Sequence, residues 1–122
     1  MIGYVTLGTN DFERATQFYD QLLKEIGASR FMETEAFVAW VTSPGKPALS
    51  VTKPFDGNAA TVGNGVMVAL AMGSTDQVDS FYKRAMELGA TDEGAPGPRG
   101  DGFYAGYFRD PDGNKLNAFC MS

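Results

Sequence analysis

The stretch YFRDPDGNKLNAF, residues 107–119, predicts two adjacent strands joined by a tight turn. In the turn, residues 110–113, proline presets one φ angle, aspartate offers local backbone hydrogen bonds, and glycine accepts a positive φ. We interpret the turn as a structural hairpin that fixes the register of the returning strand, residues 115–119. The register places Asn117 on one sheet face, where its amide is a candidate for hydrogen bonding to a ligand.

The chain repeats itself once. Phe18-Tyr19 and Phe81-Tyr82 lie 63 positions apart, and Leu7 and Leu70 have the same offset. The segment FYDQLLKEIGA matches FYKRAMELGA with one deletion. Because the repeat spans about half of the chain, it predicts two copies of one structural module.

Each module predicts the order strand, helix and three strands, which makes the chain an α+β protein of two tandem βαβββ modules. We expect helices at residues 11–26 and 74–88, and strands at 2–7, 37–41, 49–52, 66–72, 103–108 and 115–119, with weaker strands at 30–32 and 91–95. Neither module alone buries enough surface to be stable, so we expect one domain over residues 1–122. Its parts are module one, 1–55, a linker, 56–65, and module two, 66–122.

Alternation along the strands sorts side chains into two faces. Aliphatic residues are expected under the helices: Val5, Leu7, Leu49, Val51, Val68, Leu70, Leu116 and Ala118. A mixed polar and aromatic set is expected on the opposite face: Tyr4, Thr6, Ser50, Thr52, Met67, Ala69, Ala71, Lys115, Asn117 and Phe119. A concave face lined in this way predicts a small-molecule site, unless it packs against another surface.

Composition narrows the chemistry. The chain has no histidine and one cysteine, Cys120, which excludes histidine-dependent nucleophile systems and ordinary zinc or iron sites. The net charge of −5 argues against a nucleic-acid partner. No apolar run is long enough to span a membrane. The start, MIGYVTLGTND, lacks the features of a signal peptide, and we expect a cytoplasmic protein.

The start YVTLGTNDFERATQFYDQLL, the second copy of the module and the closing hairpin resemble the vicinal oxygen chelate superfamily. This superfamily contains glyoxalase I, bleomycin-resistance proteins, extradiol dioxygenases and fosfomycin-resistance enzymes. The resemblance implies paired modules that form a cupped mixed sheet, and commonly a homodimer. It also implies a metal site in the metal-using members, with histidine, glutamate or glutamine ligands on four strands.

The positions that correspond to these ligands carry other residues in this chain. The resemblance places them at Tyr4, Ser50, Met67 and Asn117, with Thr52 as the near alternative to Ser50. None of these side chains is an anionic or good nitrogen ligand. We therefore expect no metal and no other cofactor.

Three further side chains are candidates for ligand contact. Trp40 and Tyr107 offer aromatic surface, although core or interface packing is the alternative for Trp40. Arg99 lies in the stretch 94–102, which is rich in glycine and proline and which we interpret as a loop. Its guanidinium is suited to binding a carboxylate or phosphate. Glu33 and Glu35 are the fallback metal ligands, and a solvated strand edge is their alternative.

We expect a metal-independent binding protein for a small molecule rather than an enzyme, with sequestration of a toxic or aromatic compound as its role. The expected ligand-binding residues are Tyr4, Thr6, Trp40, Ser50, Thr52, Met67, Arg99, Tyr107 and Asn117. The alternative is a metal-dependent glyoxalase-type lyase or dioxygenase with an atypical site. A third interpretation is a structural or regulatory dimer whose cup is filled by its own side chains.

Overall fold

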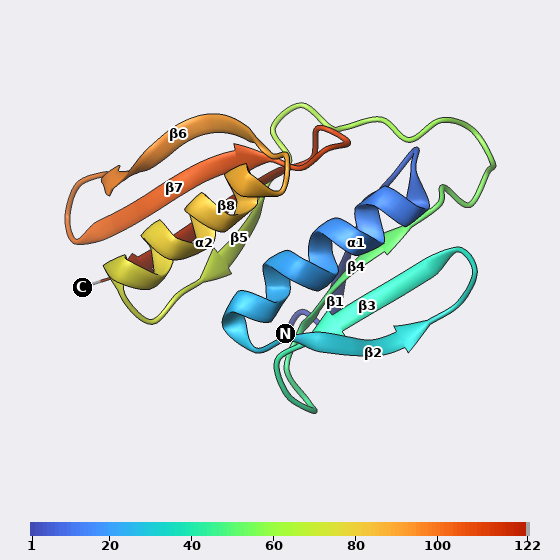
Figure 1. The fold of residues 1–122 in the computed structure, drawn as a ribbon, viewed down its shortest axis with the longest axis horizontal. Helices are drawn as coiled ribbons and strands as arrows, with labels where there is room; N and C mark the ends of the chain where they lie inside the picture. Colours follow the sequence, from blue (N-terminus) through green and yellow to red (C-terminus); the bar gives the residue numbers. More distant parts are fainter. Residues whose placement is uncertain (122) are drawn as a thin grey trace. The chain divides into compact units, whose positions relative to one another are not determined.

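The computed structural model describes residues 1–121, which divide into two compact units, residues 1–62 and 63–121. Each unit holds one helix and one four-stranded sheet, and the order of elements is the same in both (Figure 1). The predicted α+β fold of two βαβββ repeats is therefore confirmed. The hydrogen bonding forms two separate mixed sheets, one in each unit.

The first unit begins with strand β1, Tyr4–Gly8, and helix α1, Phe12–Leu23. A short 3-10 turn, η1, Lys24–Ile26, closes the helix and is followed by β2, Ser29–Glu33, β3, Phe37–Val41, and β4, Ala48–Thr52. The sheet order is β1-β4-β3-β2, in which β1 runs parallel to β4 and the other pairs are antiparallel. Helix α1 covers one face of this sheet (Figure 1).

The second unit repeats this pattern. It contains β5, Val68–Ala71, helix α2, Thr75–Glu87, β6, Thr91–Pro98, β7, Phe103–Arg109, and β8, Lys115–Met121. The sheet order is β5-β8-β7-β6, again with one parallel pair, β5 and β8. The two units therefore share a topology as well as a sequence motif.

Sequence signals account for the helix ends. Asp11 accepts a hydrogen bond from the backbone of Arg14 at 3.1 Å, and Ser74 accepts one from Gln77 at the same distance. Such caps satisfy amide groups that the first helical turn leaves free. Gly27 has a positive φ of 77° directly after η1, which matches the predicted stop of the first helix.

The core of each unit lies between helix and sheet. In the first unit, Tyr19 and Leu22 of α1 are fully buried beside Val38, Trp40 and Val51 of the sheet. In the second unit, Val78 and Phe81 of α2 are fully buried beside Phe108 and Leu116. The alternation in the sequence correctly assigned Val51 and Leu116 to these helix-covered faces.

The predicted loop at residues 94–102 is partly wrong. Strand β6 continues to Pro98, and only the end of the stretch forms the turn to β7. Register shifts between Asp92 and Gly94 and between Gly94 and Gly97 accommodate the glycines in this strand. An edge strand also tolerates proline, because its outward amide positions need no partner strand.

Two strands start later than predicted, and part of the expected linker is hydrogen-bonded to the first unit. Strands β1 and β5 begin at Tyr4 and Val68 instead of residues 2 and 66. Within the expected linker, Ala60 exchanges two hydrogen bonds with the side chain of Asn10, at 2.7 and 3.0 Å. These bonds fold residues up to Ala60 onto the first unit.

Candidate ligand-binding faces

The face of each sheet opposite its helix, here called the open face, carries the residues singled out by the sequence. Strand register confirms how these residues correspond between the units. Thr6 pairs with Ser50 across β1 and β4, and Ala69 pairs with Asn117 across β5 and β8. Ser50 and Asn117 therefore occupy equivalent positions in the two units, in agreement with the positions that the family resemblance indicated.

On the open face of the first unit, Ser50 is fully buried, and its hydroxyl takes part in two hydrogen bonds. Its hydroxyl donates to the carbonyl of Val5 at 2.7 Å. Since that proton is used, the hydroxyl of Thr6 is the donor in the 2.9 Å bond between Thr6 Oγ1 and Ser50 Oγ. Ser50 thus fastens β4 to β1 and has no spare donor for a ligand.

Tyr4 and Thr52 lie on the same open face. The Tyr4 side chain is 63% exposed, and its ring meets that of Phe37 edge to face at 6.3 Å. The Thr52 hydroxyl lies within hydrogen-bonding distance of two main-chain carbonyls, 2.9 Å from Lys53 and 3.1 Å from Ala36. Of the two, Tyr4 is the side chain more available for contact.

On the open face of the second unit, Asn117 differs from its counterpart. Its side chain is only 1% exposed, and within the described part of the chain its Oδ1 is buried without a hydrogen-bond partner. Its strand neighbours are Ala69, which has no polar side-chain atom, and Tyr107. Buried polar atoms are almost always paired, so an exception calls for an explanation.

Cationic side chains surround Tyr107, the residue opposite Asn117. The Arg99 guanidinium lies 5.5 Å from the centre of the Tyr107 ring, and the Lys115 ammonium lies 5.6 Å from it. Next along the sheet, Arg109 Nε donates to Glu93 Oε1 at 3.0 Å. Asn117, Tyr107, Arg99 and Lys115 are thus brought together by the two adjacent strands β7 and β8 and by the turn after β6.

Trp40 does not belong to this set. It pairs with Leu49 on the helix-covered face, where its indole N–H donates to Asp20 at 2.8 Å and its ring lies 5.7 Å from that of Tyr19. The side chain is 2% exposed. The structure therefore corrects its assignment to a ligand-binding face, because the β3–β4 register directs it into the core.

Met67 lies just before β5 and is 39% exposed, so it is accessible.

The fallback metal ligands, Glu33 and Glu35, do not lie on an open face. Glu33 bonds to Arg30 at 2.5 Å, and Arg30 in turn bonds to Asp20 of α1, which places Glu33 toward the helix. Glu35 lies in the exposed turn between β2 and β3. Over residues 1–121, no three His, Cys, Asp or Glu side chains gather as a metal-binding group.

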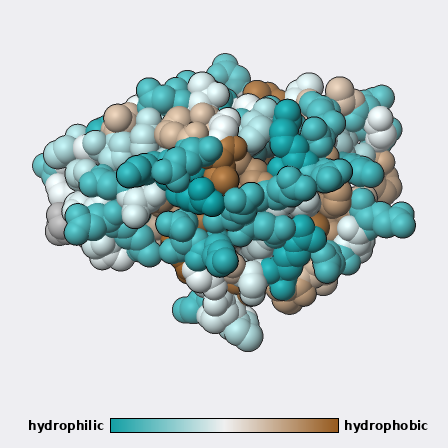
Figure 2. All heavy atoms as spheres, in the orientation of Figure 1, coloured by the Kyte–Doolittle hydropathy of each residue, from teal (hydrophilic) through white to brown (hydrophobic). Residues whose placement is uncertain are grey.

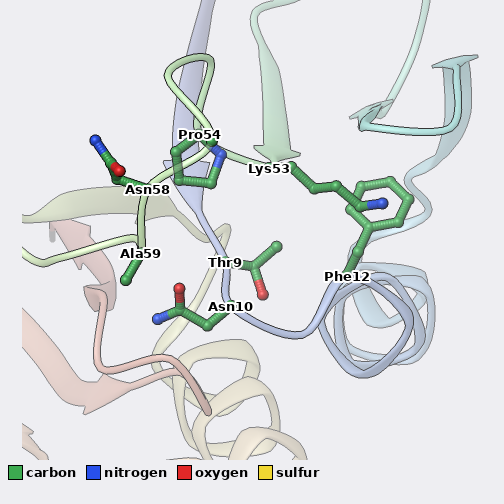
Figure 3. A pocket seen from close by; sticks show the side chains of 8 residues that line it. Thr9, Asn10, Phe12, Lys53, Pro54, Asn58 and Ala59 are labelled. Atoms are coloured by element: carbon green, nitrogen blue, oxygen red, sulfur yellow. The ribbon is translucent and has the colours of Figure 1, made fainter.

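Outside the open faces, the first unit has a shallow hollow of about 310 Å³ where β1 and β4 end (Figure 3). Thr9 and Asn10 line one side, and Pro54, Asn58 and Ala59 line the other. Its polar groups are largely engaged, since Asn10 bonds twice to Ala60 and the Thr9 hydroxyl accepts from Asp11. Lys53 reaches over the ring of Phe12 at 5.5 Å.

The molecular face drawn in Figure 2 is largely hydrophilic, with hydrophobic residues in small patches. In the part of the chain that the structure describes, no helix is long and apolar enough to cross a membrane.

Comparison with known families agrees with this geometry. The sequence profile of the Glyoxalase/Bleomycin resistance protein/Dioxygenase superfamily matches residues 1–118. The chain belongs to this superfamily, as the resemblance had indicated. Among curated proteins, no match was found.

Solved structures show the same fold. A glyoxalase/bleomycin resistance protein from Albidiferax ferrireducens T118 is 36% identical, with a TM-score of 0.91 and coverage of 100% of this chain and 99% of that one. Lactoylglutathione lyase from Agrobacterium tumefaciens is 20% identical, with a TM-score of 0.72 and coverage of 98% and 92%. The fosfomycin resistance protein FosX from Mesorhizobium loti is 17% identical, with a TM-score of 0.71 and coverage of 100% and 92%. The last two show a likeness of fold alone.

Lys115 contributes to the second open face but was not among the expected ligand-binding residues. Alternation placed Lys115 on the same face as Asn117, but nothing in the sequence indicated that it lies against the ring of Tyr107. The signal that was available is the spacing of two residues along one strand, which puts both side chains on one face.

Proposed function

We propose that this protein binds a small organic molecule without a metal ion and that Asn117 is the central hydrogen-bonding group. The observation that carries the proposal is the unpaired, buried Oδ1 of Asn117. The equivalent residue of the first unit, Ser50, has both its hydrogen bonds. The contrast separates a residue that fastens the sheet from one that is kept for a ligand.

An unpaired buried oxygen is costly. Leaving such a group without a partner typically costs about 1–3 kcal/mol. A ligand that donates an N–H or O–H to Asn117 recovers this free energy on binding. The adjacent Tyr107 ring, together with Met67 just before β5, offers aromatic and apolar contact for the rest of such a molecule.

The residues at the four family ligand positions do not fit a divalent metal. Tyr4, Ser50, Met67 and Asn117 supply two hydroxyls, a thioether and a neutral amide, and no carboxylate or imidazole. The Ser50 proton is donated to Val5, so this hydroxyl is committed to the sheet. No step of the proposed function therefore runs through a metal.

The test compares two substitutions at equivalent positions. Asn117→Leu keeps the number of side-chain heavy atoms but removes the unpaired oxygen. We expect the free energy of unfolding without ligand to stay level or rise by up to about 1–2 kcal/mol. Thermal-shift screening against a small-molecule library should then show compounds that stabilise the unaltered protein and fail to stabilise the variant.

Ser50→Ala serves as the matched control. It removes the partner of Thr6 and of the Val5 carbonyl, so we expect the free energy of unfolding to fall by about 1–3 kcal/mol. The proposal is wrong if Asn117→Leu destabilises the protein as much as Ser50→Ala, or if it leaves the response to every stabilising compound unchanged.

We further propose that the protein acts as a homodimer in the cytoplasm. Exposed apolar side chains support an association surface, and Phe31 and Met32 on β2 are 62% and 51% exposed. The single cysteine, Cys120, is buried and free, which agrees with a compartment where disulfides are rare. Sedimentation equilibrium measures the first claim, and a single monomeric mass at micromolar concentration would contradict it.

A further inference from the structure

We propose that the ligand is a small organic carboxylate that also carries a hydrogen-bond donor, and that Arg99 and Lys115 bind its carboxylate. This inference rests on the proposed function, since it takes Asn117 as the acceptor for the donor of the ligand. All the groups involved belong to the second unit.

The open face of the second unit has more positive than negative charge. Arg99 and Lys115 lie against the Tyr107 ring, and Glu93 is the carboxylate that pairs with Arg109 and Lys115. Glu93 is closest to Arg109, at 3.0 Å, and lies 3.9 Å from the Lys115 ammonium. Within residues 1–121, Arg99 has no carboxylate partner, whereas the whole chain carries a net charge of −5. An acidic protein thus keeps a local cationic site.

The cations are held in place by neutral groups. Arg99 Nη2 donates to the Ala95 carbonyl at 2.6 Å and Nη1 to the Pro98 carbonyl at 3.4 Å. A guanidinium has five N–H donors, so these two bonds leave donors for a carboxylate. Arg99 and Lys115 each lie against the ring of Tyr107. An anion that reaches both cations would offset their positive charges.

Spacing defines the rest of the ligand. Lys115 and Asn117 are two residues apart on β8, so their side chains stand about 7 Å apart on the same face. A ligand that reaches both needs its donor and its carboxylate separated by about the length of a benzene ring. Hydroxy- or amino-substituted aromatic carboxylates have this arrangement.

Three probes of nearly equal shape test the inference. 4-Hydroxybenzoate has the carboxylate and the donor, 4-hydroxybenzamide lacks the negative charge, and benzoate lacks the donor. Titrations of the complete protein would be followed by ¹H–¹⁵N NMR. We expect 4-hydroxybenzoate to bind at least about fivefold more tightly than either of the other two, because charge-assisted hydrogen bonds are the stronger ones. Added salt should weaken its binding and leave that of 4-hydroxybenzamide unchanged.

Variants then assign the carboxylate contact. Arg99→Gln and Lys115→Gln should each weaken 4-hydroxybenzoate at least about fivefold and leave 4-hydroxybenzamide unchanged. Arg99→Lys, which keeps the charge, should lose less than Arg99→Gln. Lys83→Gln removes one positive charge from the exposed side of α2 and should change neither affinity.

The outcomes separate this inference from the proposed function. Equal binding of 4-hydroxybenzoate and 4-hydroxybenzamide, or equal losses for both in Arg99→Gln and Lys115→Gln, would overturn the carboxylate inference and leave the binding function standing. Failure of all three probes at millimolar concentration would also overturn the inference. The binding function itself fails only if the comparison of Asn117→Leu with Ser50→Ala goes against it.

Discussion

At the residue scale, one pair of equivalent positions shows how a repeated module diverges. Ser50 and Asn117 have the same place in the register, but both of their cross-strand neighbours differ, Thr6 and Ala39 for Ser50 against Ala69 and Tyr107 for Asn117. Thr6 supplies Ser50 with a hydrogen-bond donor, whereas Ala69 has no polar side-chain atom. The exchange of Thr6 for Ala69 removes the donor that the central polar residue of the first unit uses.

Gly106 of β7 is a second residue whose identity is set by its neighbour. A Cβ atom added there would lie 2.9 Å from Pro96 Cγ and 3.3 Å from Pro96 Cα. Because the second contact is with backbone, a side-chain rotation cannot relieve it. We expect Gly106→Ala to lower the free energy of unfolding by about 1–3 kcal/mol in urea denaturation.

Gly3→Ala is the control for this substitution, since no atom lies within 4 Å of the added Cβ. We expect a change within about 0.5 kcal/mol for it. If Gly106→Ala were equally neutral, strand β6 would not be held as closely against β7 as the structure shows.

At the element scale, hydrogen bonds between side chains connect each helix to the edge of its sheet. In the second unit, the Tyr82 hydroxyl of α2 donates to Asp92 of β6 at 2.6 Å. Burial, together with this bond, raises the pKa of Tyr82 to about 12. The same bond, with a second one from the Gly94 amide, lowers the pKa of Asp92 below its ordinary value.

These pKa shifts predict a pH dependence of stability. The raised tyrosine pKa contributes stability that is complete below the unfolded value, about 10, and is lost as the pH rises through 12. The lowered aspartate pKa contributes stability that is present above about 3.9 and is lost as the pH falls further. The difference in unfolding free energy between the unaltered protein and Tyr82→Phe should therefore be flat between pH 4 and 10 and shrink outside this window.

Urea denaturation across this pH range checks the prediction. Lys83→Gln, one residue along the same helix, removes no hydrogen bond to β6 and should show no such window. A Tyr82→Phe difference that persists unchanged to pH 12 would mean that the bond to Asp92 does not stabilise the folded state.

Much of this arrangement of elements was predictable from the sequence. Caps, glycine stops and alternation identified both helices and the strands, and the family resemblance identified Ser50 and Asn117 as corresponding positions. Strand β6 was partly missed, since its glycines and prolines are typical of loops and only an edge position with bulges accommodates them. Trp40 was assigned to the wrong kind of surface, because its face depends on the pairing with Leu49, which alternation within one strand does not specify.

The binding groups of the second unit were only partly predictable. The sequence singled out Asn117, Tyr107 and Arg99 separately. The contact of Arg99 and Lys115 with one aromatic ring depends on how the turn after β6 folds back along the sheet. Among the described residues, the Asn117 side-chain oxygen lacks a partner beside Ala69, its neighbour on β5. That pairing is known only once the strand register is known.

At the scale of the whole molecule, the family includes proteins that use a metal ion, but the residues at the corresponding ligand positions of this chain do not favour metal binding. We expect the purified protein to retain far less than one metal ion per chain after incubation with Mn²⁺, Ni²⁺, Zn²⁺ or Fe²⁺ and desalting. The reason is that Tyr4, Ser50, Met67 and Asn117 are neutral donors that hold divalent ions weakly.

Elemental analysis gives the answer directly. Near-stoichiometric metal would contradict the proposed function and turn attention to oxygen ligands such as Glu33 and Glu35. A variant with Asn117→Glu would provide a comparison, since it restores a carboxylate at the position where metal-using relatives have one.

The bonds between Asn10 and Ala60 have a consequence for proteolysis. Because they hold the start of the connecting segment on the first unit, the exposed stretch without such ties begins only after Ala60. Peptide bonds at residues 61–66 are therefore the expected sites of first cleavage by a nonspecific protease. A cut there would divide the chain so that each piece contains one complete sheet and its helix, and the bonds between Asn10 and Ala60 would stay within the first piece.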